Sequence, residues 1–272
     1  MPVFFNNVLN DLKDMTPLWE YAFLFGIGLI AGFVNVLAGG GSMITVPVMV
    51  FLGLPGHIAN GTNRIAILVQ NLVAVVTFFR RGLSDFKLSL LLLACTLPGA
   101  VVGALAGTQL RGAWFNRTLA VVMVLLLIFM WAKKGLKPKA DLASPAVEPK
   151  GKRLLWGCVL MIGIGFYGGF IQIGVSLMLM PLLNRVLGID LVRVNMHKVF
   201  IIFGYTIFAL SIYAWRLDIR WLLGCALALG NGIGGWAGAT MSVQKGERLI
   251  RILLNVALVA FIIKLLLFSA VD

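Results

Sequence analysis

Acidic residues are scarce in this sequence of 272 residues, and they lie at the predicted ends of apolar segments or in loops. Ten Asp and Glu residues stand against 23 Lys and Arg, and there are only two His residues. A hydrolase embedded in a membrane needs a nucleophile beside a general base, or a set of metal ligands, within its spans. The sequence offers neither arrangement, so we expect a protein that is not an enzyme.

Cysteine is sparse as well, and its pattern indicates neither a metal site nor a disulfide. Cys95, Cys158 and Cys225 lie in separate apolar runs, without a C-x-x-C pair and without a His nearby in the sequence. Cysteines in such surroundings behave as small buried hydrophobic residues. We therefore predict that the protein holds no metal and no other cofactor.

Charge of either sign is limited to 12% of the residues, whereas 60% are hydrophobic. Soluble globular proteins carry about 25% charged residues. Here the charges cluster between long apolar runs, which is typical of a polytopic helical membrane protein. The net charge of +13 is also compatible with nucleic-acid binding, but the basic residues form no separate domain. We therefore expect contact with membrane lipid and no nucleic-acid partner.

The most informative motif is a glycine run, Gly39–Gly41, followed by Ser42. It lies within residues 21–63, which carry no formal charge when histidine is counted as neutral. A break in a helix cannot face lipid, so it must be buried in protein or face a watery cavity. The restarted helix presents N–H groups and the positive end of its dipole, which suits an anion. We predict a span over 18–38, then a short helix with Ser42 as its N-cap.

A basic stretch with three prolines, residues 133–153, is typical of a flexible linker. It divides the chain into a first transmembrane repeat (1–132) and a second transmembrane repeat (154–272). The repeat is visible in residues that recur 134 or 135 positions later. These counterparts are Ser42 and Ser176, Pro47 and Pro181, and Asn60–Asn63 and Asn195–Lys198.

Basic residues also predict the orientation of the chain. Cytoplasmic loops of membrane proteins are enriched in Lys and Arg, so we place the linker in the cytoplasm. The remaining basic residues then fit best if each broken segment returns to the side from which it entered. The predicted fold is therefore all-α, a multi-pass protein of the inner membrane with two inverted repeats. Each repeat contains a helix hairpin broken at a Gly/Ser-rich turn, and such repeats hold substrate near the bilayer midplane.

The chain resembles the sulfite exporter TauE/SafE family of membrane transporters over essentially its full length. The resemblance rests on Gly32, Gly39–Gly41, Pro47, Gly53-Leu54-Pro55 and Asn60–Asn63, together with the weaker second copy. It implies transport of sulfite, sulfonates or related small anions. The second copy departs from a full glycine run, because Ile173 and Val175 flank Gly174.

The candidate substrate-binding residues lie at the two breaks and at the start of the helices that follow them. An oxyanion needs several convergent donors, which hydroxyls, amides and backbone N–H groups can supply. A cation at membrane depth is costly and usually functional. The candidates are Gly40, Gly41, Ser42, Asn60, Thr62 and Asn63 in the first repeat, and Gln172, Gly174, Ser176, His197 and Lys198 in the second.

Each candidate also has a structural interpretation. The glycines can serve close helix packing, and the polar residues of Asn60–Asn63 can cap their helix. Lys198 can extend its amine to the cytoplasmic face. Arg64 has the same alternative, and we rank it below Lys198 as an anion ligand.

Export of an anion requires no coupling ion, because an inside-negative membrane potential drives a monovalent anion outward with about 2.3 kcal/mol per 100 mV. We therefore predict a secondary transporter that exports sulfite or an organosulfonate by alternating access. The alternative is uptake of thiosulfate, formate or another small anion together with protons, through His197. The oligomeric state stays open.

Overall fold

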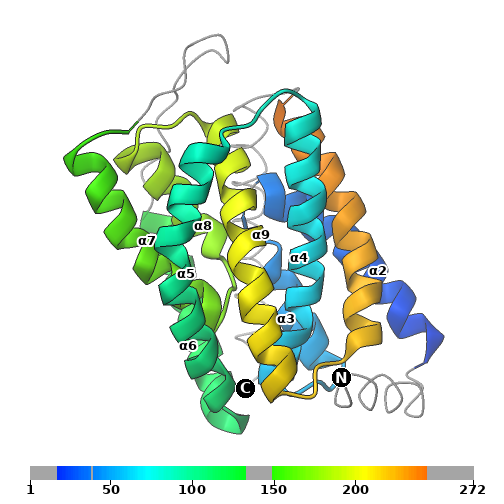
Figure 1. The fold of residues 1–272 in the computed structure, drawn as a ribbon. Coiled ribbons are helices and arrows are strands. Elements are labelled where there is room, and N and C mark those ends of the chain that lie inside the picture. Colours follow the sequence, from blue (N-terminus) through cyan, green and yellow to red (C-terminus); the bar gives the residue numbers. More distant parts are fainter. Residues whose placement is uncertain (1–16, 38, 133–148, 244–272) are drawn as a thin grey trace.

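The computed structural model describes residues 17–37, 39–132 and 149–243, and within these ranges the regular structure is entirely helical (Figure 1). Six of the described helices are long and apolar enough to cross a membrane. The predicted all-α, polytopic class is thereby confirmed. Residues 133–148 of the predicted linker and residues 244–272 of the second repeat lie outside the described residues.

The described helices lie on both sides of the predicted linker, and the helix that follows it begins within its last two residues. The first repeat contains α2 (Leu18–Leu37), α3 (Ser42–Phe51), α4 (Gly56–Arg80), α5 (Phe86–Gln109) and α6 (Gly112–Ala132). The second contains α7 (Lys152–Phe170), α8 (Val175–Pro181) with its continuation as a π-helical turn η1 (Leu182–Val186), α9 (Leu191–Arg216) and the helix Trp221–Val243. The second repeat thus restates the order of the first, with the short helix split in two.

Two of the scarce acidic residues serve as helix caps. The Asp85 carboxylate accepts a hydrogen bond of 3.1 Å from the N–H of Leu88 at the start of α5. Asp190 accepts from the N–H groups of Val192 and Arg193, at 3.1 and 2.9 Å, at the start of α9. A side-chain cap of this kind contributes about 1 kcal/mol to helix stability. These acids therefore shape helix ends.

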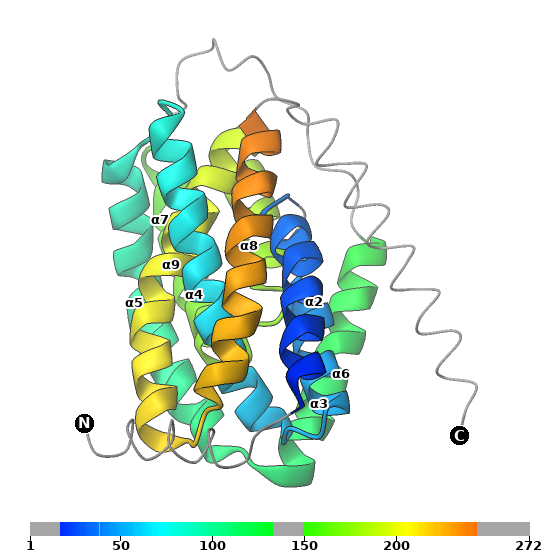
Figure 2. The same ribbon diagram turned by 90° about the vertical axis from the view of Figure 1, so that its right-hand side faces the viewer.

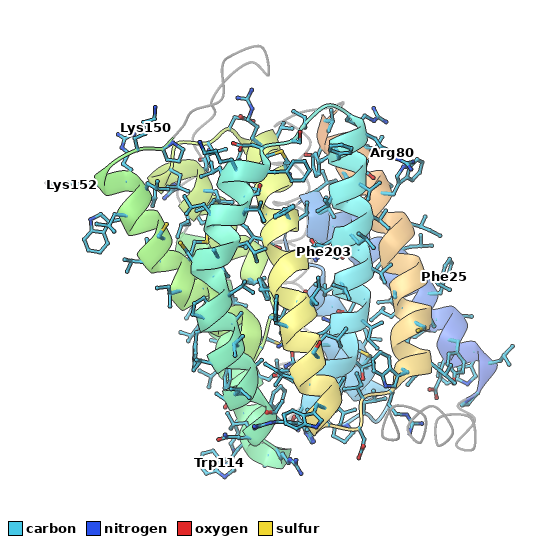
Figure 3. All side chains as sticks on the ribbon, viewed as in Figure 1. Phe25, Arg80, Trp114, Lys150, Lys152 and Phe203 are labelled. Carbon is cyan, nitrogen blue, oxygen red and sulfur yellow. The ribbon has the colours of Figure 1, made fainter. Side chains whose placement is uncertain are left out.

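Helices α4 and α9, which correspond in the two repeats, run in opposite directions. Gly61, early in α4, packs against Tyr213, late in α9. Arg80 at the end of α4 and Lys152 at the start of α7 lie at one end of the bundle, and Trp114 in α6 lies at the other (Figure 3). The end of α4 and the start of α7 therefore lie on one side, as the charge pattern predicts.

Helices α5 and α7 approach each other through small residues. A Cβ added to Gly99 or Gly103 of α5 would lie 2.0 Å from the carbonyl oxygen of Ile162 or Phe166 in α7. Only residues without a side chain allow backbones to come this close. The contact joins a helix of the first repeat to a helix of the second.

The helix Trp221–Val243 makes the corresponding contact with α2. A Cβ on Gly230 or Gly234 would lie 2.1 Å from the carbonyl oxygen of Phe25 or Leu29, and the two helices lie side by side (Figure 2). In both contacts the glycines lie four residues apart and form a small-residue seam along one helix. The first long helix on each side of the linker thus packs against a long helix from the other side.

Candidate anion-binding site at two helix breaks

The first break follows α2. Gly39 has φ +88°, in the left-handed region that favours glycine, and its N–H donates to the carbonyls of Val34 and Asn35 at 3.1 and 3.0 Å. The predicted N-cap at Ser42 is wrong. Gly41 already has φ −57° and ψ −41° and takes the cap position without a side-chain cap, so Ser42 is the first residue of α3.

The second break follows α7 and is held by side chains. Gln172 has φ +65° and Gly174 has φ +68°. The Gln172 amide donates to the Thr206 hydroxyl at 2.9 Å, and the Tyr167 hydroxyl donates to the carbonyl of Ile173. These bonds fix a turn that contains a glutamine where left-handed geometry costs about 1 kcal/mol or more.

The two breaks lie in direct contact. A Cβ added to Gly39 would lie 2.6 Å from Cβ of Ser176 and 3.1 Å from the backbone nitrogen of Leu177. Gly174 in turn packs against the end of the Met43 side chain. Ser176 is the second residue of α8 and not its N-cap, because Gly174 takes that position.

Gly40 has open space around its Cα, unlike Gly39 and Gly41. No described atom outside its chain neighbours lies within 4 Å of a Cβ placed there, although the residue is half-buried. A small ligand can therefore approach the backbone at Gly40.

Helix α4 begins at Gly56, after Pro55, so the polar residues 60–63 lie inside the helix and not at its cap. The alternative that they cap α4 is therefore wrong. Thr62 points to another contact, since its hydroxyl accepts a hydrogen bond of 3.1 Å from the N–H of Arg220, just before the helix Trp221–Val243. Of the three polar candidates in α4, Thr62 is thus held outside the breaks by this hydrogen bond.

Asn60 and Asn63 connect α4 to the elements that form the breaks. The Asn60 amide donates to the carbonyl of Phe170, the last residue of α7, at 3.2 Å and to the Tyr213 hydroxyl at 3.0 Å. The Asn63 side-chain oxygen accepts a hydrogen bond of 2.7 Å from Thr45 in α3. The Asn63 amide nitrogen is buried and makes no hydrogen bond.

Lys198 is buried, with 1% of its surface exposed, and does not extend to the cytoplasmic face. Its amine donates to the carbonyl of Val36 at 2.7 Å, to that of Asn35 at 3.4 Å and to the side-chain oxygen of Asn195 at 2.8 Å. Val36 lies in the last turn of α2, where the helix dipole is negative. Lys198 therefore stabilises the end of the helix that leads into the first break.

His197 lies next to Lys198 in sequence but contacts a different helix. Its Nδ1 is 2.8 Å from the hydroxyl of Ser89 in α5, and the ring is 2% exposed. Ser89 lines a cavity of about 20 Å³ together with Asp85 and Met196, which is room for one or two water molecules. The described contacts of His197 thus lead to the start of α5.

Arg64 belongs to this region and, like Lys198, does not extend to the cytoplasmic face. Its side chain is fully buried, and its guanidinium donates to the carbonyls of Gly168, at 3.2 Å, and Gly169 in the last turn of α7. The guanidinium carbon lies 4.1 Å from the centre of the Tyr213 ring. Arg64 and Lys198 are 134 positions apart, the spacing of Ser42 and Ser176, and this is the signal that could have found it.

Comparison with known proteins agrees with this architecture. The family model described as sulfite exporter TauE/SafE matches residues 24–265, a region that includes both breaks and both buried cations. The chain belongs to the sulfite exporter TauE/SafE family. No solved structure matches.

Relatives of this TauE/SafE family member are described as transporters. It is 29% identical over 245 residues to the probable membrane transporter protein ORF9 of Sinorhizobium sp, covering 90% of this chain and 92% of the relative. It is 26% identical over 231 residues to a probable membrane transporter protein of Haemophilus influenzae, covering 85% and 88%. It is 23% identical over 259 residues to YunE of Bacillus subtilis, covering 88% and 95%. The protein is a multi-pass membrane transporter of the TauE/SafE type.

Proposed function

We propose that this transporter exports a small sulfur-containing anion, sulfite or an organosulfonate, across the inner membrane. The observation that carries the proposal is the direct contact of the two helix breaks, Gly39 against Ser176. A break inside a membrane exposes backbone N–H groups, and these can donate hydrogen bonds to an oxyanion. The family name supports sulfite as the first substrate to test.

The donors proposed for the anion come from both repeats. The first break offers its backbone at Gly40 and Gly41 and the hydroxyl of Ser42, and the second offers Gln172, Gly174 and Ser176. Asn60 and Asn63 from α4 and Lys198 from α9 complete the proposed set, whereas the described contacts of Thr62 and His197 lie outside the breaks. Ser42, Ser176 and Lys198 are each 3% exposed or less, so the anion would be held away from bulk water.

Flux measurements with the purified protein in liposomes test the proposal. We expect sulfite efflux that rises as the inside-negative potential is increased, since each 100 mV is worth about 2.3 kcal/mol for a monovalent anion. Ser42→Ala, Ser176→Ala and Lys198→Gln should each reduce that flux. Unchanged flux in all three variants would refute the site assignment, and absence of flux for every sulfur anion tested would refute the substrate class.

We also propose that the two repeats have inverted topology in the membrane and alternate access around the breaks. The opposite courses of α4 and α9 support this proposal. In a variant without its own three cysteines, Arg80→Cys at the end of α4 and Arg216→Cys at the end of α9 should react with a membrane-impermeant thiol reagent from opposite sides. Labelling of both from the same side would refute the inverted arrangement.

Proton-coupled uptake of thiosulfate, formate or another small anion is a second candidate function. The observation in its favour is the buried hydrogen bond between His197 and Ser89, because Ser89 lines the small cavity beside Asp85. If this function is correct, flux should follow an imposed pH gradient and be lost in His197→Ala. Flux in His197→Ala that still follows the pH gradient would exclude a route through His197.

A further inference from the structure

Arg64 carries a full charge into the interior without an acidic partner in the described part of the chain. The Arg193–Asp190 ion pair, 3.3 Å apart, lies instead at the start of α9. The acceptors of Arg64 are neutral backbone carbonyls at the end of α7. A helix C-terminus is equivalent to about half a negative charge, and the face of the Tyr213 ring adds a cation–π contact, but neither supplies a full opposite charge.

The guanidinium also has one N–H group that makes no hydrogen bond. Nε of Arg64 is buried and makes no hydrogen bond, and the same holds for the amide nitrogen of Asn63, the preceding residue. A buried donor without a partner is unfavourable, and a buried uncompensated charge is more unfavourable still. Both costs disappear if a molecule that enters the site supplies acceptor atoms and negative charge.

Both donors adjoin the breaks. The side-chain oxygen of Asn63 accepts a hydrogen bond from Thr45, the fourth residue of α3 after the first break. The side-chain nitrogen of Asn63 is therefore the atom without a partner. Arg64 is bonded to Gly168 and Gly169, just before the second break. The two neighbouring residues of α4 therefore link the two breaks and leave one unused donor at each.

Each of the two buried cations contacts a helix of the repeat to which it does not belong. Arg64 of the first repeat holds the end of α7 in the second, and Lys198 of the second repeat holds the end of α2 in the first. Lys198 has Asn195 as a side-chain acceptor in addition to its carbonyls, whereas the described hydrogen bonds of Arg64 go to two backbone carbonyls. Lys198 therefore has a side-chain acceptor on its own helix, and Arg64 has none among its described hydrogen bonds.

On the basis of the proposed anion transport, we propose that Arg64 is the principal fixed charge of the anion site and that Asn63 is its neutral second donor. The ligand class is a small oxyanion, which accepts well from a guanidinium. In this assignment Lys198 serves chiefly to hold α2, and the anion replaces part of the partial charge that the end of α7 provides to Arg64.

The test measures sulfite flux and, separately, the rise in thermal midpoint that an anion causes in the purified protein. We expect Arg64→Lys to raise the KM for sulfite at least tenfold, since a lysine offers no planar pair of donors. Arg64→Gln should lose flux at least 100-fold and lose the anion-dependent rise in thermal midpoint. Arg80→Gln, at the exposed end of the same helix, is the matched control and should keep both.

Asn63→Asp decides the matter if Arg64→Gln does not fold. It keeps the oxygen that accepts from Thr45 and replaces the unused donor by an acceptor, so we expect a folded protein that anions no longer stabilise. A folded Arg64→Gln with unchanged KM, or Asn63→Asp with an unchanged response to anions, would overturn the assignment.

The panel for thermal stabilisation is sulfite, thiosulfate, sulfoacetate and formate. Wild-type protein that none of them stabilises has no such anion site, which overturns this inference. Wild-type protein that an anion stabilises through Arg64, but that transports none, would leave the site standing and refute the proposed transport.

Discussion

Both helix breaks contain left-handed backbone geometry, but they reach it with different residues. The first relies on glycine, with Gly39 at φ +88° packed against Ser176 and the backbone nitrogen of Leu177 at the start of α8. The second places Gln172 and Gly174 in left-handed geometry and holds the turn by side-chain bonds from Gln172 and Tyr167. The comparison teaches that the first break depends on the absence of side chains and the second on their presence.

The largest effect should come from Gly39→Ala, which adds a methyl group where the space is already filled. The Cβ would lie 2.6 Å from that of Ser176, and left-handed geometry adds strain, so we expect a loss of about 3 kcal/mol in unfolding free energy. Gly40→Ala, in the same break, should change it by less than about 0.5 kcal/mol, because the Cβ meets open space. Unfolding in mixed micelles measures both.

The Gly40→Ala variant also tests occupancy of that space. If the substrate anion contacts the backbone there, the KM for sulfite should rise about threefold or more while stability is kept. Equal stability of Gly39→Ala and Gly40→Ala would show that the first break is not tightly packed, and the comparison of the breaks would then fail.

The next effect concerns the cation at the first break. Lys198→Gln removes the ammonium that holds the end of α2 and leaves at least the Val36 carbonyl without its donor. We expect a loss of about 2 kcal/mol and reduced flux, read from the thermal midpoint and from sulfite efflux. Lys198→Arg is the matched variant that keeps the charge, and it should retain more stability than Lys198→Gln; the reverse order would refute a role in holding α2.

The smallest effect should come from removing one hydroxyl at each break. Thr206→Val removes the acceptor of Gln172 at the second break, and Thr45→Val removes the donor to Asn63 in the helix after the first. Each change should cost about 1 kcal/mol, because it leaves one buried polar atom without its partner. Thermal midpoints of the two variants measure this, and a much larger loss in Thr45→Val would show that side chains also hold the first break.

Much of the fold follows from sequence periodicity and glycine placement. The span predicted over 18–38 is α2 (Leu18–Leu37), and the small-residue seams on α5 and on the helix Trp221–Val243 are where the glycines place them. These features follow from length, apolarity and the absence of side chains. The twofold recurrence of the break likewise needs no tertiary information.

The details of the site could not be read in the same way. Ser42 was expected as the N-cap of α3, but Gly41 takes that position, as Gly174 does for α8. Arg64 was ranked below Lys198 because a long basic side chain can reach the membrane surface. Whether it does so depends on what acceptors the fold places nearby, and the end of α7 is about one hundred residues away in the chain, at Gly168.

The close glycine contacts between repeats have a consequence for how the protein can move. Since α2 is locked to the helix Trp221–Val243 and α7 to α5, each rigid pair combines one helix from either side of the linker. Each pair carries one of the two breaks at the end of its α2 or α7. A displacement of one pair against the other would separate Gly39 from Ser176 and leave both glycine contacts intact. Under the proposed alternating access, the two breaks are therefore the surfaces that would separate.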